Sequence, residues 1–122
     1  MGLDTFAYTA LKGPDGTRNP IDAEEFRSDP AIIQNTVFDG HSFRGKIYAE
    51  LVETATGQSL YQEEIPPVTV GTMAADLAAW VIEHRLNKTT LNQFGVTTAE
   101  LDALAAWFKV VSNNGGIVVG WW

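Results

Sequence analysis

Cysteine is absent from the 122 residues of this chain. Its absence excludes disulfide bonds, thiolate zinc sites and cysteine nucleophiles. Basic residues are scarce as well, because eight lysines and arginines stand against fifteen acids and leave a net charge of −7. A surface that acidic repels phosphate backbones at long range, so we expect no nucleic acid partner.

Long hydrophobic runs are also missing. No apolar stretch approaches the roughly 20 residues that a membrane helix needs, so we expect no membrane association. Residues 1–8 lack the basic segment followed by an apolar segment that marks a signal peptide. These absences together predict a cytoplasmic protein.

The residues that are present suffice for a hydrophobic core. Hydrophobic residues make up 45% of the chain, and the aromatic ones comprise four Trp, three Tyr and six Phe. At this length the composition predicts a single domain over residues 1–122, which buries roughly two thirds of its unfolded surface. No cofactor, metal or disulfide is required to explain folding, and none is expected.

The first part of the chain is divided into short segments. Residues 3–10 are rich in Thr and aromatic side chains and end at a turn cluster, 12–16, which predicts a strand and then a turn. Asn19-Pro20, followed by acids, has the pattern of a helix start. Asp29-Pro30 is expected to end that helix early. Residues 31–38 fit either a short strand or an irregular segment.

The spacing of apolar residues predicts three longer helices. The first begins at Ser42 and stops at Gly57, and the second begins near Pro66-Pro67. The third opens with the capping box of residues 97–100 and ends at residues 113–116. The inner faces are expected to carry Phe43, Ile47, Tyr48, Leu51, Val52 and Ala55; Val70, Met73, Ala74, Leu77, Val81 and His84; and Leu101, Leu104, Ala105, Phe108 and Val111, with Trp80 and Trp107 beside them.

The chain closes on an apolar, β-branched and aromatic run, residues 117–122, which predicts a strand built into a sheet. Residues 58–65 are a weaker strand candidate. Strands and helices do not alternate regularly, so the predicted fold class is α+β. We expect a small antiparallel or mixed sheet that includes the N- and C-terminal strands and packs against three to four helices.

The last two residues, Trp121 and Trp122, are the first candidates for an interface. Side chains alternate along a strand, so one ring should face the core and the other should point away from it. An outward Trp is typical of binding hot spots. The alternative is a sheet whose second face is covered by another helix.

A second candidate site lies at the start of the first long helix, where Ser42, Arg44, Gly45 and Lys46 combine free N–H groups, two cations and a glycine. This combination predicts an anion site. The alternative is that both cations pair with surface carboxylates such as Asp39 or Glu50. The segment also matches most of the phosphate-loop pattern, but Ile47 stands where Ser or Thr would hold magnesium.

No motif identifies a catalytic residue or a metal site. Asp4, His41 and Glu63 are the residues to test for metal or acid–base chemistry, but their spacing does not bring them together. His41 is interpreted as a loop residue, and His84 as a partly buried residue near the end of its helix. The chain is therefore more consistent with a protein that is not an enzyme.

Several motifs resemble those of a family of small uncharacterised bacterial proteins, cyanobacterial ones among them. They are the opening MGLDTFA, SFRGKIYAELV at residues 42–52, TGQSLYQE at 56–63 with IPP at 65–67, and the closing GWW. Residues 15–39 carry no part of the resemblance. The resemblance implies a bacterial, soluble protein and implies no activity, cofactor or site residue.

Three functions fit these observations. The first is a non-catalytic binding domain that self-associates or binds a protein partner through an aromatic or apolar face. The second is a small-anion or phospho-ligand binding protein or enzyme with its site at residues 42–46. The third is a phage- or defence-linked inhibitor, whose acidic surface would occupy the basic cleft of an enzyme.

Overall fold

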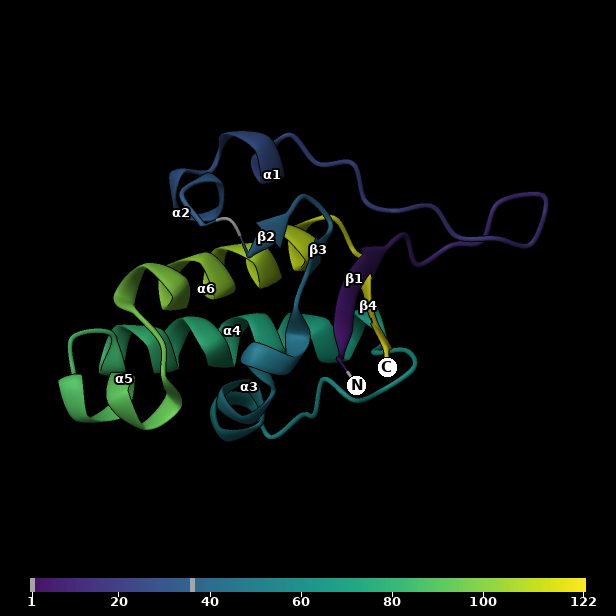
Figure 1. The fold of residues 1–122 in the computed structure, drawn as a ribbon. Coiled ribbons are helices and arrows are strands. Elements are labelled where there is room, and N and C mark those ends of the chain that lie inside the picture. Colours follow the sequence, from purple (N-terminus) through teal and green to yellow (C-terminus); the bar gives the residue numbers. More distant parts are fainter. Residues whose placement is uncertain (1, 36) are drawn as a thin grey trace.

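The computed structural model describes residues 2–35 and 37–122 and shows an α+β fold, as the sequence predicts (Figure 1). Met1 and Thr36 lie outside the described residues. In chain order the elements are β1 (Asp4–Tyr8), α1 (Glu25–Ser28), α2 (Pro30–Ile33), β2 (Phe38–Asp39), β3 (Ser42–Phe43), the 3-10 helix η1 (Gly45–Ile47), α3 (Ala49–Thr56), α4 (Pro67–His84), α5 (Lys88–Phe94), α6 (Thr98–Asn113) and β4 (Ile117–Trp121).

The strands form an antiparallel sheet of order β2-β3-β1-β4 within the described residues. β1 and β4 are paired along their whole length, from Asp4 opposite Trp121 to Tyr8 opposite Ile117. β3 pairs with the first half of β1 only, through Thr5 and Phe6. The prediction that the N- and C-terminal strands lie in the sheet is confirmed, and the two strands are direct neighbours.

One face of the sheet is covered by the packed pair α4 and α6 (Figure 1). The helix faces are those that the apolar spacing predicts, because nearly all the expected inward residues of both helices are buried. Ala105, Trp80 and His84 are half-buried instead. Tyr48, Trp107 and Phe108 are fully buried at the centre of the core. The strands therefore lie on a rigid helical layer.

The predicted capping box opens α6, and its glutamate also reaches into the core. Glu100 Oε1 accepts from the Thr97 amide at 3.1 Å, and Thr97 Oγ1 accepts from the Glu100 amide at 3.1 Å. The other carboxylate oxygen accepts from the buried Tyr48 hydroxyl at 2.6 Å. Burial, followed by this hydrogen bond, raises the pKa of Tyr48 well above its ordinary value. The Glu100 side chain thus caps α6 and also holds Tyr48, the residue directly before α3.

The helix predicted from Ser42 to Gly57 begins later than expected. Ser42 and Phe43 form β3, residues 45–47 form η1, and α3 starts at Ala49. The cause is nonlocal, because Phe43 pairs with β1 and is buried there. Only the end of the helix is as predicted, with Gly57 in the left-handed conformation at φ 74°.

The helix predicted at Asn19-Pro20 is wrong. Pro20 forms a β-bridge with Tyr8, and the Ile21 amide donates to the Ala7 carbonyl at 3.1 Å, so this segment extends the sheet. α1 starts only at Glu25. Asp29 ends it as expected and then caps α2 with its side chain. The segment 31–38 is neither of the two predicted alternatives, since α2 occupies its beginning and β2 starts near its end.

The segment 58–65 forms no named strand and instead lies along the free edge of β4. The amides of Ile65 and Val118 each donate to the other residue's carbonyl, at 2.7 and 3.2 Å, and the Gly120 amide donates to the Gln62 carbonyl at 2.9 Å. α5 was not predicted from the sequence. Its signals were local, an Asn87 cap and Gly95 at φ 66°.

Candidate binding surface

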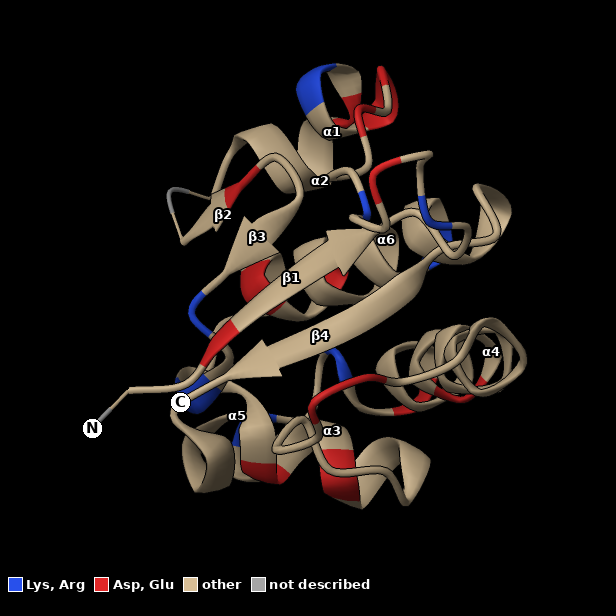
Figure 2. Cartoon of the chain, turned by 90° about the vertical axis from the view of Figure 1, so that its right-hand side faces the viewer, with Lys and Arg blue, Asp and Glu red and all other residues tan. Residues whose placement is uncertain are grey.

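The two faces of the sheet differ in what covers them. Thr5 and Ala7 of β1 point into the core with their partners on β4, and both are fully buried. The alternate residues Asp4, Phe6 and Tyr8 point the other way and are exposed or half-buried. In Figure 2 this second face is turned to the viewer, and no described element lies in front of β1 and β4.

Four aromatic rings meet on this uncovered side, and we call them the aromatic face: Phe6, Tyr8, His41 and Trp121. The ring centroid of Phe6 lies 6.2 Å from that of Tyr8, 6.1 Å from that of His41 and 6.5 Å from that of Trp121. Trp121 is 71% exposed, and the other three side chains are half-buried. Such spacings are typical of interacting aromatic pairs.

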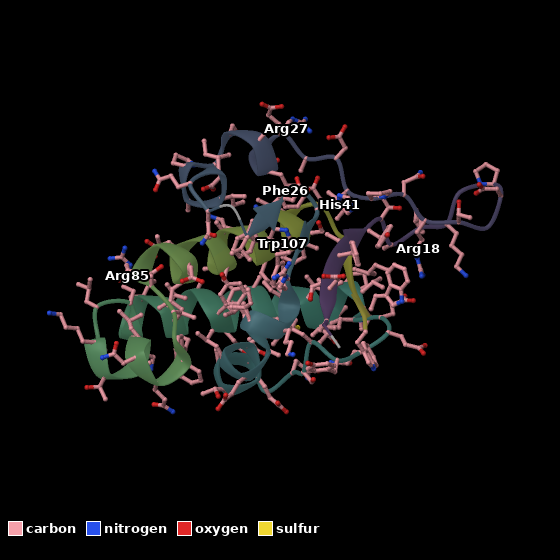
Figure 3. The ribbon with its side chains drawn as sticks, in the orientation of Figure 1. Arg18, Phe26, Arg27, His41, Arg85 and Trp107 are labelled. Atoms are coloured by element: carbon pink, nitrogen blue, oxygen red, sulfur yellow. The ribbon has the colours of Figure 1, made fainter. Side chains whose placement is uncertain are left out.

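His41 joins this cluster through the turn between β2 and β3. Figure 3 labels His41 next to β1. Its carbonyl oxygen accepts from the Ala7 amide at 2.8 Å, so the turn is fixed to β1. Its ring lies 6.1 Å from that of Tyr8, nearly at right angles. His41, which the sequence predicted to be a loop residue, is therefore part of an ordered surface.

Two hollows flank the aromatic face. The first has a volume of about 310 Å³ and the second of about 340 Å³. The first is lined by Asp4, Phe6, Val37, Ser42, Phe43 and Arg44. The second is lined by Tyr8, Lys12, Gly16, Arg18 and Val119. Each hollow therefore combines an aromatic ring of the face with at least one basic residue.

The second hollow is bounded by an arm, residues 9–19, that projects from the sheet (Figure 1). The arm is hydrogen-bonded along its length, from the Thr9 amide to the Asn19 carbonyl at 2.8 Å and from the Gly13 amide to the Thr17 carbonyl at 2.7 Å. At its tip Thr17 donates to the Asp15 carboxylate, which lowers the pKa of Asp15. Arg18 ties the arm to the body through Glu64 at 2.8 Å.

The predicted anion residues do not lie at the N-terminus of a long helix, because Gly45 and Lys46 begin the three-residue 3-10 helix η1 instead. Ser42 is in β3, and its hydroxyl donates to the Asp39 carbonyl at 3.2 Å. Gly45 is buried because Thr5 and Leu3 occupy the space that a side chain would need. The Lys46 amide is already used, since it donates to the Leu3 carbonyl at 3.2 Å. One of the N–H groups that motivated the site is therefore not free to bind an anion.

Arg44 and Lys46 are both exposed, and no ion pair within the described residues involves either cation. The alternative pairing with Asp39 or Glu50 is thus not formed. Arg44 and Ser42 share the first hollow, with the Asp4 carboxylate beside them. Anion binding at these residues stays a prediction.

The prediction that the two C-terminal tryptophans lie on opposite sides of a strand, with one ring in the core, is wrong. Trp121 belongs to the aromatic face, and Trp122 is 50% exposed beyond the end of β4. Its ring packs edge-on against Tyr61 at 5.6 Å. The inward position near this end of the strand is Gly120, because the backbone of residues 60–62 fills the space there.

The residues considered for metal or acid–base chemistry remain apart. Within residues 2–35 and 37–122 no three His, Cys, Asp or Glu side chains are grouped to hold a metal ion. His41 belongs to the aromatic face and Asp4 lies at the start of β1 on the same side of the sheet, whereas Glu63 lies in the segment beside the opposite edge of β4. His84 is half-buried against Trp80, with ring centroids 4.4 Å apart, as its structural interpretation predicts.

Sequence reasoning identified Trp121 but missed Phe6 and Tyr8. The signal was present, since the alternation of residues in β1 places Phe6 and Tyr8 on one side of the strand.

Comparison with protein-family models, curated protein sequences and solved structures gave no match for this chain. No described helix has the length and hydropathy to cross a membrane. The resemblance to the bacterial family stays a prediction.

Proposed function

We propose that this chain is a non-catalytic protein-binding domain, and that it binds its partner through the aromatic face. The observation that supports the proposal is the cluster of four rings on the uncovered side of the sheet, with Trp121 71% exposed at its edge. Partly exposed rings that contact one another are held in place before binding. They offer large apolar area at a low cost in conformational entropy.

The surroundings of the face favour a partner with both apolar and acidic side chains. Lys12, Arg18 and Arg44 stand at the two hollows, although the chain as a whole carries a net charge of −7. An apolar centre with a charged rim is the usual anatomy of a protein interface. The two hollows can each take one apolar side chain. Lys12 and Arg44 have no ion pair within the described residues and can pair with carboxylates of the partner, whereas Arg18 is already paired with Glu64.

The experiment is a capture assay with the immobilised chain and the soluble proteins of its source organism, quantified by mass spectrometry. We expect Trp121→Ala and Phe6→Ser to reduce capture of a specific protein by at least about tenfold, as loss of a hot spot does. Trp122→Ala is the matched control, because it removes an exposed Trp that lies outside the aromatic face. Equal capture by wild type and Trp121→Ala would refute the proposal.

A fold control accompanies the capture assay. Trp121 is mostly exposed, so its removal should leave the unfolding midpoint near that of the wild type. Loss of capture in a variant with an unchanged midpoint then reports on the surface and not on unfolding. A second copy of the chain on this face would appear as self-association that Trp121→Ala abolishes.

A further inference from the structure

α4 carries a second apolar face on the side opposite the core. Val68 is 85% exposed and Ile82 is 78% exposed, and the small residues Thr72, Ala75 and Ala79 between them are exposed too. The intervals along this set alternate between four and three residues, which is the spacing of a helix that packs on another helix. In Figure 2 α4 is seen end-on at the right margin, with no described element beyond it.

Large side chains stand at both ends of this outer face and small ones between them, with Ala75 midway between Val68 and Ile82. The large residues Val68 and Ile82 stand at equal distances on either side of it, and Thr72 and Ala79 lie between. A twofold axis through an antiparallel helix pair brings each residue against the one at the mirrored distance. Val68 would then meet Ile82 of the second copy, while small residues meet at the centre and let the backbones approach.

The charges at the two ends of α4 are complementary in the same arrangement. Glu63 lies four residues before the first residue of α4, in the extended segment beside β4, and Lys88 lies four residues after its last residue, at the start of α5. Both side chains are exposed, and neither has an ion pair within the described residues. Antiparallel pairing brings Glu63 of one copy toward the end that carries Lys88 in the other, where Glu83 is exposed as well, and it sets the two helix dipoles in opposite directions.

A groove of about 420 Å³ runs beside the outer face, between α4 and α6. It is lined by small residues and one basic residue: Gly71, Ala74, Ala75, Ala78, Ala105, Ala106, Lys109, Ser112 and Asn113. α4 has 18 residues and is therefore about 27 Å long, and the axes of two packed helices such as α4 and α6 lie about 9 Å apart. Together the outer sides of the two helices present a surface of roughly 500 Å². Stable complexes bury about 800 Å² on each partner, so this surface suits a weak dimer.

We propose that the outer face of α4 binds the same face of a second copy, as an antiparallel helix pair centred on Ala75. This surface is separate from the aromatic face, and the inference does not depend on the proposed function. Asp76 is exposed on the flank of the outer face, one residue from the twofold axis, so it lies close to Asp76 of the second copy. That repulsion and the net charge of −7 keep the dimer weak at low salt.

Disulfide cross-linking tests the geometry directly, because the chain contains no cysteine. Ala75→Cys should form a disulfide dimer in a glutathione buffer, and Thr54→Cys, exposed on α3, should form one at least about tenfold more slowly. A mixture of Val68→Cys and Ile82→Cys should cross-link faster than either variant alone. Faster cross-linking of each with itself would contradict the antiparallel pairing.

Sedimentation analysis tests association without a covalent bond, from about 10 µM to about 1 mM protein in about 0.5 M salt, which screens the net charge. We expect a monomer–dimer equilibrium that Ala75→Glu abolishes and Asp76→Asn tightens several-fold. Thr54→Glu adds the same charge elsewhere and should leave it unchanged. A wild type that stays monomeric throughout, or a dimer that survives Ala75→Glu, would overturn the proposal.

The proposals for the aromatic face and for the outer face of α4 can be refuted separately. Ala75→Glu should leave capture through the aromatic face intact, and Trp121→Ala should leave the dimer intact. A dimer that only Trp121→Ala disrupts would place self-association on the aromatic face and remove it from α4.

Discussion

The indole nitrogen of Trp107 donates a hydrogen bond to the carbonyl oxygen of Gly40, 3.0 Å away. Trp107 is fully buried on α6, and Gly40 lies in the β2–β3 turn at φ 56°, directly before His41. This bond connects the helical layer to the turn that supplies one ring of the aromatic face. The position of His41 is thus set by the core and not by the loop alone.

We expect Trp107→Phe to destabilise the protein by about 2 kcal/mol, because it removes the donor and leaves a cavity. Urea unfolding measures the change, and NMR should show a shift of the His41 amide in the same variant. Trp80→Phe is the control, since Trp80 is half-buried and no described hydrogen bond involves its indole nitrogen. An equal loss of stability in both variants would show that the bond to Gly40 contributes little.

Gly45 and Gly71 are predicted to respond to alanine in opposite directions. A Cβ on Gly45 would collide with the Thr5 hydroxyl and lie 3.2 Å from the Leu3 side chain, so Gly45→Ala should cost about 1–3 kcal/mol. A Cβ on Gly71, inside α4, would meet only Ser112 Oγ at 3.6 Å. Gly71→Ala should therefore stabilise the protein by about 0.5–1 kcal/mol. Urea midpoints measure both, and a stabilising Gly45→Ala would contradict the packing.

The buried Tyr48 should make stability fall at alkaline pH. Its pKa is raised in the folded state from an ordinary value of 10.0, so above about pH 10 the unfolded chain loses this proton first. The contribution is complete below pH 10 and is lost as pH rises toward the folded pKa, by up to about 1.4 kcal/mol per pH unit.

Urea unfolding of wild type and Tyr48→Phe at pH 8, 9.5 and 11 measures this dependence. Tyr48→Phe lacks the hydrogen bond to Glu100, so it should be less stable than the wild type at pH 8. The gap should narrow at pH 11, because only the wild type loses the tyrosine contribution. Parallel curves across the range would show that Tyr48 does not titrate differently in the two states.

Most helix ends that the sequence predicted correctly have local causes. The Thr97–Glu100 capping box and the left-handed Gly57 depend on residues a few positions apart, and both lie where predicted. The Asn87 cap and Gly95 of α5 are signals of the same kind, although the sequence analysis predicted no helix there. Local chemistry therefore sufficed for most helix ends in this chain.

The errors have nonlocal causes. Phe43 and Tyr48 share a helical spacing with later residues, but Phe43 is drawn into the sheet by Thr5, far away in the sequence. Because of the same pairing, α3 begins only at Ala49, so the α-helix N-terminus on which the anion site was predicted lies after residues 42–46. The aromatic face shows the same limit, because Trp121 and Phe6 come from opposite ends of the chain and the β1–β4 register brings them together.

Gly120 lies at the edge of β4, where alanine is predicted to destabilise the protein. A Cβ there would lie 2.5 Å from the Leu60 carbonyl oxygen and 2.7 Å from that of Gln62, both backbone atoms that cannot move aside cheaply. Gly120→Ala should push residues 60–62 away and break the hydrogen bond from residue 120 to Gln62, at a cost of about 2–3 kcal/mol.

Hydrogen exchange locates the damage from this substitution. In the wild type the amides of Ile65, Val118 and Gly120 should be protected, since all three donate across this edge. Gly120→Ala should speed exchange at Ile65 while β1 keeps its protection. Gly2→Ala is the control, because nothing lies within 4 Å of its Cβ position. Unprotected amides in the wild-type residues 117–121 would mean that the closing segment is not held in the sheet, and the aromatic face would lose the strand that carries Trp121.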